Sequence, residues 1–211
     1  MLLALDLSTA HGSIAVVNGD DVLFRSSFQS ERSHNAQVFA PLREALAAAG
    51  NQLTGIVIGN GPGSYTGVRI AIAAAQGIAL SRNIWCVGWS SLTAPDLDAP
   101  SNYNIIGDAR RQSFYIASVK NSRLQSDLEI VPPETARQRV ADCEIVYTFD
   151  AKPPLDLPLV SAKPDAAKLA KIIQSLPTAE LEALIALPLI PHYLAEAFIT
   201  MPKRPAHTPT P

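Results

Sequence analysis

The chain has 211 residues, of which 47% are apolar and 17% are charged, so an intrinsically disordered protein is excluded. Its formal net charge is −2, which gives no overall positive field to hold a nucleic-acid backbone. If the protein acts on RNA, we therefore expect another protein to bind most of that RNA. The length allows one large domain or two small ones.

The first residues and the cysteines exclude further classes. The segment from Met1 to Asp6 lacks the basic start of a secretion signal, and no apolar run approaches the ~20 residues that cross a bilayer. Cys86 and Cys143 are far apart and show no CxxC spacing, so we predict neither a disulfide nor a zinc site. The sequence predicts a cytoplasmic protein without membrane contact.

The first part of the chain predicts the order βββαβαβ. Strands are expected at 2–7, 13–17 and 22–29, with a type I′ turn at Asn18-Gly19. A one-sided apolar stripe predicts a helix at 35–49 that ends at Gly50. A strand at 55–59, a glycine-rich loop at 61–67, a helix at 68–80 and a strand at 85–88 follow. The stripe consists of Val38, Phe39, Leu42, Ala45, Leu46 and Ala49.

The rest of the chain predicts a weaker copy of this order. Residues 95–100 indicate a linker, and strands are expected at 103–107, 114–120, 128–131 and 144–149, with helices at 134–140 and 164–175. Two βββαβα lobes, at 1–94 and 95–211, predict the duplicated α/β fold of actin, heat-shock ATPases and sugar kinases (ASKHA), with the second lobe reduced. Residues 202–211 are proline-rich, which is typical of a segment without fixed structure.

The turn after the first strand is a candidate phosphate site. In a fold of this kind such a turn wraps phosphates with hydroxyls and backbone amides. Asp6 would lie near a phosphate-bound magnesium, and Ser8, Thr9 and Ser13 would supply hydroxyls. The alternative is a hairpin in which these side chains satisfy their own backbone.

The glycine-rich segment from Gly59 to Arg69 offers a second contact to a nucleotide, through Gly61, Gly63 and Ser64. Ser64 or Thr66 can cap the following helix, whose N-terminus could hold an anion. No lysine follows the glycines, so a Walker P-loop is excluded. A purely structural turn explains the same residues.

The third candidate is Asp108, at the end of the first strand of the second lobe, where ATPases of this fold carry an Asp-x-Gly loop. Arg110 stands in place of that glycine, which argues against ordinary ATP hydrolysis, and an exposed turn is the alternative. The histidines offer no metal pair, since Val38 lies four residues after His34. We expect no catalytic residue and no metal ligand in this chain.

Several motifs together resemble the bacterial TsaB family. They are Leu3 to Thr9, Ser33-His34, the GPGSYTGVR run at 61–69, Ala75 to Leu80, Gly88 to Leu92 and Asp108 to Arg111. The resemblance is dense in the first half and thin in the second. The family commonly shows Pro-x-Tyr-[LI]-Arg near its end, whereas this chain has Ala195 in place of the arginine.

The resemblance implies a non-catalytic, glycoprotease-like (M22) scaffold for the transferase TsaD, which threonylcarbamoylates adenosine 37 of ANN-decoding tRNAs. It implies a heterodimer with TsaD, TsaE as a further member, self-association when the chain is alone, and tRNA contact only through the complex. ATP or ADP and a divalent metal would lie in the partner, and this chain would have no cofactor of its own.

The resemblance also places the partner interface on the two helices of the first lobe. This agrees with the second helix being apolar on almost every side, although both faces could instead be buried within one chain. We expect Ala75→Arg to break partner binding and leave the fold intact. The rival functions are a small-molecule or sugar kinase of the same fold and a metallopeptidase. The expected interface residues are Val38, Leu42, Leu46, Ile72, Ala75 and Ala79.

Overall fold

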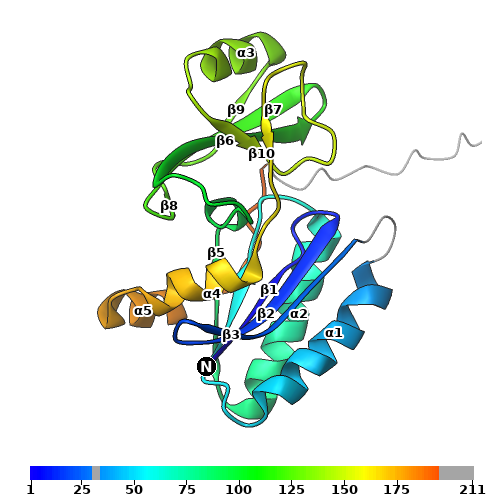
Figure 1. Cartoon of the computed structure of the whole chain (residues 1–211), viewed down its shortest axis with the longest axis vertical. Coiled ribbons are helices and arrows are strands. Elements are labelled where there is room, and N and C mark those ends of the chain that lie inside the picture. Colours follow the sequence, from blue (N-terminus) through cyan, green and yellow to red (C-terminus); the bar gives the residue numbers. More distant parts are fainter. Residues whose placement is uncertain (30–33, 195–211) are drawn as a thin grey trace, which may run out of the picture.

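A five-stranded sheet forms the first lobe of the computed structural model, which describes residues 1–29 and 34–194 (Figure 1). Its strands are β1 (Leu2–Asp6), β2 (His11–Asn18), β3 (Asp21–Gln29), β4 (Gly55–Gly59) and β5 (Trp85–Trp89). They lie in the order β3-β2-β1-β4-β5, with β1, β4 and β5 parallel, β2 antiparallel to β1, and β3 antiparallel to β2. Every residue of β1 and β4 is buried, because helices cover both faces of the sheet.

Two helices, α1 (His34–Ala49) and α2 (Tyr65–Arg82), cover one face of this sheet. The α1 helix ends at Gly50, whose φ of 55° is readily adopted only without a side chain. The α2 helix begins three residues before its predicted start, because the Ser64 hydroxyl accepts a hydrogen bond from the Gly67 N–H at 3.1 Å and caps it.

The other face of the first sheet is covered from the far end of the chain, by α4 (Ala166–Gln174) and α5 (Thr178–Ile185). The Ser13 hydroxyl accepts a hydrogen bond from the Ala166 N–H at 3.0 Å, and Leu169 packs under the sheet. The prediction that residues 95–211 form the second lobe is therefore wrong for α4 and α5, which pack on the first lobe. Sequence order suggested the boundary, whereas the apolar stripe of α4 is buried against the first lobe.

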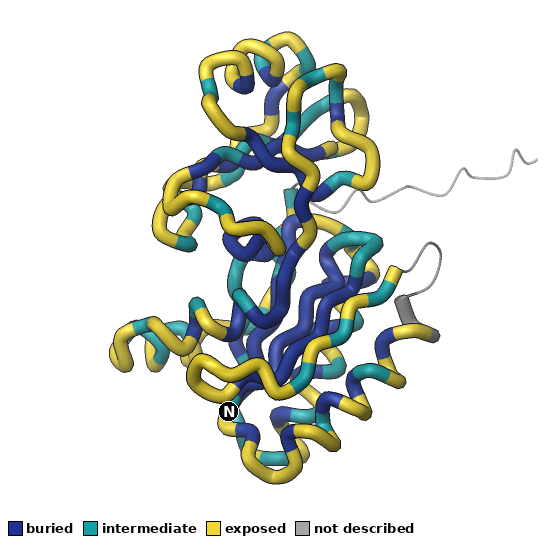
Figure 2. Tube along the Cα trace, viewed as in Figure 1, coloured by how far each residue is buried: buried dark blue, intermediate teal, exposed yellow. Residues whose placement is uncertain are grey.

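The second sheet has the order β11-β10-β6-β7-β8, with β9 also paired to β7. One face packs on α3 (Pro133–Ala141), and the other packs toward the first lobe, where the Tyr103 hydroxyl donates to the Leu92 carbonyl at 2.8 Å. This lobe is smaller than the first (Figure 2). Its strands are β6 (Asn102–Arg110), β7 (Ser113–Lys120), β8 (Arg123–Leu124), β9 (Glu129–Val131), β10 (Val146–Thr148) and β11 (Val160–Ser161).

The chain crosses between the lobes at a short helix, η1 (Ser91–Thr93), and at the bridge between Pro95 and Pro164. Residues of the two lobes are in contact beside these crossings. The Trp89 indole N–H donates to the Ser122 carbonyl at 3.2 Å. Arg123 forms an ion pair with Glu180 of α5, and the Arg123 guanidinium lies over the Trp89 ring.

Two local predictions differ from the structure. Asn18 pairs with Asp21, so the turn consists of Gly19 and Asp20, and only Gly19 has positive φ; the turn is therefore not a type I′ turn at Asn18-Gly19. Phe39 is 57% exposed, on the outer side of α1 rather than in its buried stripe. Ser33, Ala195 and residues 202–211 lie outside the described residues. Among the helices that are described, none is long and apolar enough to cross a membrane.

Candidate ligand cleft between the lobes

A cleft of about 540 Å³ lies between the lobes and brings together parts of all three predicted nucleotide segments. Ser8 and Thr9 line it from the β1-β2 turn, Gly63 and Ser64 from the loop before α2, and Asp108 from the end of β6. The remaining three predicted residues do not line it. Asp6 and Gly61 lie buried beneath the loops, and Ser13 is used by α4.

Asp6 is fully buried at the end of β1, and its side chain mainly organises the turn that follows. Its Oδ1 accepts hydrogen bonds from the Ser8 N–H at 2.9 Å and from the Ser8 hydroxyl at 2.6 Å. Its Oδ2 has no hydrogen-bond partner within the described chain and abuts Gly59, where a Cβ would overlap it. Burial raises the pKa of Asp6, and the hydrogen bonds from Ser8 offset this rise in part.

The loop before α2 packs directly on the β1-β2 turn. A Cβ at Gly63 would overlap the Ser8 carbonyl oxygen, and a Cβ at Gly67 would overlap the Leu7 carbonyl oxygen. Both obstacles are backbone atoms, which cannot move aside as a flexible side chain can. The two glycines therefore allow close packing, which favours the structural explanation of this motif.

Several backbone N–H groups that could hold a phosphate are already used inside the chain. The Ser64 N–H donates to the Ser8 carbonyl at 2.6 Å, and the His11 N–H donates to the Thr9 hydroxyl at 3.1 Å. The Gly61 N–H donates to the Ser91 hydroxyl at 3.1 Å. An anion that entered the cleft would have to compete with these bonds, which weakens the case for nucleotide binding.

The second-lobe side of the cleft is acidic. The Asp150 carboxylate accepts a hydrogen bond from the Asp108 N–H at 2.7 Å, and burial together with the nearby Asp108 charge raises the pKa of Asp150. Arg110 folds back on Asp108, with Nη1 3.2 Å from Oδ2, in a turn where residues 110–112 all have positive φ. Two carboxylates and one already paired arginine favour a neutral or cationic ligand over a phosphate.

The sequence did not reveal the segment that borders the cleft at residues 192–194. Tyr193 stacks on Tyr65 with ring centroids 5.3 Å apart, and the Arg69 Nε donates to the Tyr193 hydroxyl at 2.7 Å. The His192 N–H donates to the Asn60 carbonyl at 2.8 Å. The only sequence signal was the Pro-x-Tyr motif, whose structural role is to fasten this segment to the start of α2.

The predicted interface residues lie mainly inside the chain. Five of the six are buried in the core under α1 and α2, and Leu46 packs against that core while partly exposed. They face their own sheet because they form the apolar stripes by which the two helices dock. The placement of the interface on these six residues is therefore corrected, whereas the outer faces of the same helices remain available.

No cluster of three or more potential metal ligands occurs in residues 1–29 and 34–194. Cys86 and Cys143 are free, and burial raises the pKa of both thiols. His11 borders the β1-β2 turn, and partial burial lowers its pKa.

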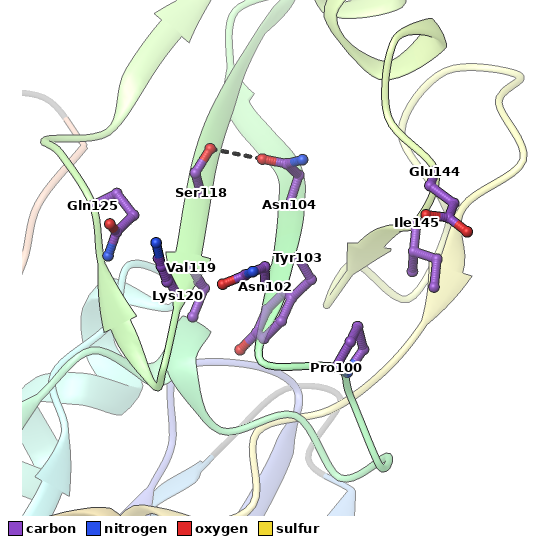
Figure 3. A pocket seen from close by; sticks show the side chains of 10 residues that line it. All are labelled: Pro100, Asn102, Tyr103, Asn104, Ser118, Val119, Lys120, Gln125, Glu144 and Ile145. Carbon is purple, nitrogen blue, oxygen red and sulfur yellow. Dashed lines mark hydrogen bonds between the residues drawn. The ribbon is translucent and has the colours of Figure 1, made fainter.

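A second cavity, of about 500 Å³, opens on the outer face of the second lobe (Figure 3). Two of its polar side chains, Ser118 and Asn104, are bonded to each other. The Ser118 hydroxyl donates to Asn104 Oδ1 at 2.7 Å, and Asn104 Nδ2 donates to the Cys143 sulfur at 3.2 Å. Lys120 and Glu144 contribute opposite charges to its walls, so the cavity has no clear preference for a charged ligand.

Comparison with known proteins gives a consistent result. A family model described as TsaD, tRNA N6-adenosine threonylcarbamoyltransferase, matches residues 28–142, more than half of the chain. The tRNA threonylcarbamoyladenosine biosynthesis protein TsaB of Haemophilus influenzae is 32% identical over 134 residues, which are 60% of this chain and 56% of that protein. TsaB of Escherichia coli is 37% identical over 95 residues, 43% of this chain and 40% of that protein. The chain thus matches about half the length of these curated relatives.

The fold agrees with the same group. YeaZ from Pseudomonas aeruginosa superimposes with a TM-score of 0.67 at 25% identity, over 92% of this chain and 99% of that one. Together with the TsaD-type match, this likeness confirms the predicted actin-like class of two-lobed α/β fold. The match to the family model and the four curated TsaB relatives together show that the chain belongs to the TsaB family, within the wider family of TsaD.

Proposed function

We propose that this chain is a non-catalytic partner of TsaD in the threonylcarbamoylation of adenosine 37 of ANN-decoding tRNAs, in the cytoplasm. The names of its relatives support a role in threonylcarbamoyladenosine formation. In this proposal TsaD holds the adenine nucleotide and the divalent metal, TsaE is a further member, and tRNA is contacted through the assembly. The kinase alternative is not favoured by the relatives, nor by the acidic, internally bonded cleft.

The observation that carries the proposal is the outer face of α2. Leu80 is 86% exposed there, and Gly77 and Ala73 are exposed on the same side, about one and two turns before it respectively. No atom lies within 4 Å of the position that a Cβ at Gly77 would occupy. A glycine in an exposed helix interior costs about 0.5–1 kcal/mol relative to alanine. Nothing in residues 1–29 and 34–194 packs there to compensate for this cost, whereas a partner helix packed closely on this face would.

The neighbouring helix α1 packs beside α2 and also exposes a large apolar residue, Phe39. Exposed small residues together with large apolar side chains are suited to helix packing, since they allow a close approach and bury apolar area. The face made of Phe39, Ala73, Gly77 and Leu80, here called the outer helix face, would bind TsaD in the complex. A second copy of the chain would occupy it when TsaD is absent.

The test is size-exclusion chromatography with light scattering on the chain alone and mixed with TsaD from the same organism. We expect a homodimer that converts into a mixed complex. Leu80→Arg and Ala73→Arg should abolish both assemblies and lower tRNA modification in a reconstituted reaction. Ala183→Arg, on the exposed surface of α5, is the matched control and should change neither assembly. A monomer that ignores TsaD, or equal effects of all three arginines, would contradict the proposal.

A further inference from the structure

A third cavity, of about 470 Å³, lies at the hinge between the lobes, separate from the cleft and from the outer helix face. Its walls come from three parts of the chain that are distant in sequence. The segment 93–103 crosses between the lobes, the turn at Asn121-Ser122 belongs to the second lobe, and Lys168, Lys171 and Ile172 belong to α4. The volume is within the range of small-molecule sites.

The charged residues that line this hinge cavity are both lysines. Lys168 and Lys171 stand one turn apart on α4, on the side of the helix away from its buried stripe. None of the residues that line the cavity is an aspartate or glutamate. This is unexpected for a chain whose net charge is −2, and it differs from the mixed charges of the cavity in Figure 3 and the acidic side of the cleft.

The polar groups of the hinge cavity are also available. The Lys171 ammonium group makes no hydrogen bond or ion pair with any described residue, and the side chains of Ser101, Asn121 and Ser122 likewise lack partners in that part of the chain. Lys168 donates to the Leu97 carbonyl and lies 3.9 Å from Asp98, which is fully exposed, so it keeps donors for a further acceptor. Two ammonium groups, two hydroxyls and an amide thus converge on one cavity.

The remaining walls are apolar. Pro95, Leu97, Ala99, Pro100 and Ile172 line the cavity beside the polar groups. An inorganic ion alone would leave this surface unused, whereas an organic molecule with a phosphate at one end would contact both parts. We propose that the hinge cavity binds a small organic phosphate, with its phosphate on Lys168 and Lys171 and its apolar body against the hinge segment.

The test is a titration of the full chain followed by ¹⁵N–¹H NMR, with phenyl phosphate, inorganic phosphate and phenol as three separate probes. We expect saturable shifts of the amide signals in 93–101, 121–122 and 168–172. Phenyl phosphate should bind most tightly, because it alone supplies both the charge and the apolar ring. Binding should also raise the melting temperature, because the ligand would bridge elements of both lobes.

Lys171→Met keeps most of the apolar stem and removes the charge, so it should weaken phenyl phosphate binding by about tenfold or more. Lys152→Met, on an exposed loop of the second lobe outside the cavity, is the charge-matched control and should leave binding unchanged. Equal weakening by both variants, shifts confined to other regions, or no saturable shift at millimolar phenyl phosphate would overturn the proposal. Because no partner protein is present, the result is independent of the proposed function.

Discussion

Gly77→Ala should make the isolated chain more stable and its complex with TsaD weaker. Gly77 is the thirteenth of eighteen residues in α2, and a Cβ there would meet no atom within 4 Å. Alanine therefore gains helix propensity without a clash, and the free energy of unfolding should rise by about 0.8–1 kcal/mol. For a chain of this size that corresponds to a rise in melting temperature of about 2–4 °C. Scanning calorimetry and urea unfolding measure both quantities.

Binding is measured by calorimetric titration of TsaD with the native chain, with Gly77→Ala and with Gly77→Leu. We expect Gly77→Leu to weaken binding more than Gly77→Ala, because its side chain is larger. Gly67→Ala is the matched control, because it is the same substitution in the same helix but would place a Cβ on the Leu7 carbonyl oxygen. It should lower the free energy of unfolding by about 1–3 kcal/mol. The reasoning is refuted if Gly77→Ala destabilises the chain, or if it stabilises the chain and leaves TsaD binding unchanged.

Three further predictions concern the core, the turn after β1 and the segment beside the cleft. Ala75 is completely buried, so Ala75→Arg should unfold the chain rather than only break partner binding, which circular dichroism would show. Burial raises the pKa of Asp6 above 3.8, so its contribution to stability is complete below that pH and is lost as pH rises through the folded-state pKa. As pH rises above 3.8, Asp6→Asn should therefore lose less stability than the native chain in urea unfolding, and equal losses in the two proteins would contradict this. Tyr193→Ala should raise hydrogen exchange in residues 187–194, because it removes the Tyr65 stack and the Arg69 bond; unchanged exchange would show that other contacts hold the segment.

The order of elements in the first lobe could be predicted because each element has a one-dimensional signal. The run Leu2 to Leu5 is buried on both faces and is therefore continuously apolar, and Gly50 ends α1 in the conformation that glycine favours. The short strands β8 and β11, with two residues each, have no such signal. α5 was missed because its eight residues include none that is buried.

The site was harder to predict than the fold, because its residues meet through tertiary contacts. The sequence identified Ser8, Gly63 and Asp108, and the structure places all three at one cleft. It could not show that the Ser64 N–H is already bonded to Ser8, because that bond depends on how two distant turns pack. Helical spacing identifies the apolar residues of α1 and α2 but does not show whether they face the chain's own sheet or a partner protein. The buried residues were therefore predicted to form the partner interface.

The path of the chain from Ser13 to Ala166 has a consequence for synthesis. A hydrogen bond joins these residues across 153 positions, and α4 is the helix that covers Ala4, Ala15 and Val57 on its side of the first sheet. While the ribosome is still making the second lobe, the first sheet can dock α1 and α2 but must leave its opposite face in water. From the completion of this sheet at Trp89 until α4 is made, the nascent chain therefore carries an exposed apolar surface that a chaperone would cover, and premature termination before residue 166 would yield an aggregation-prone fragment.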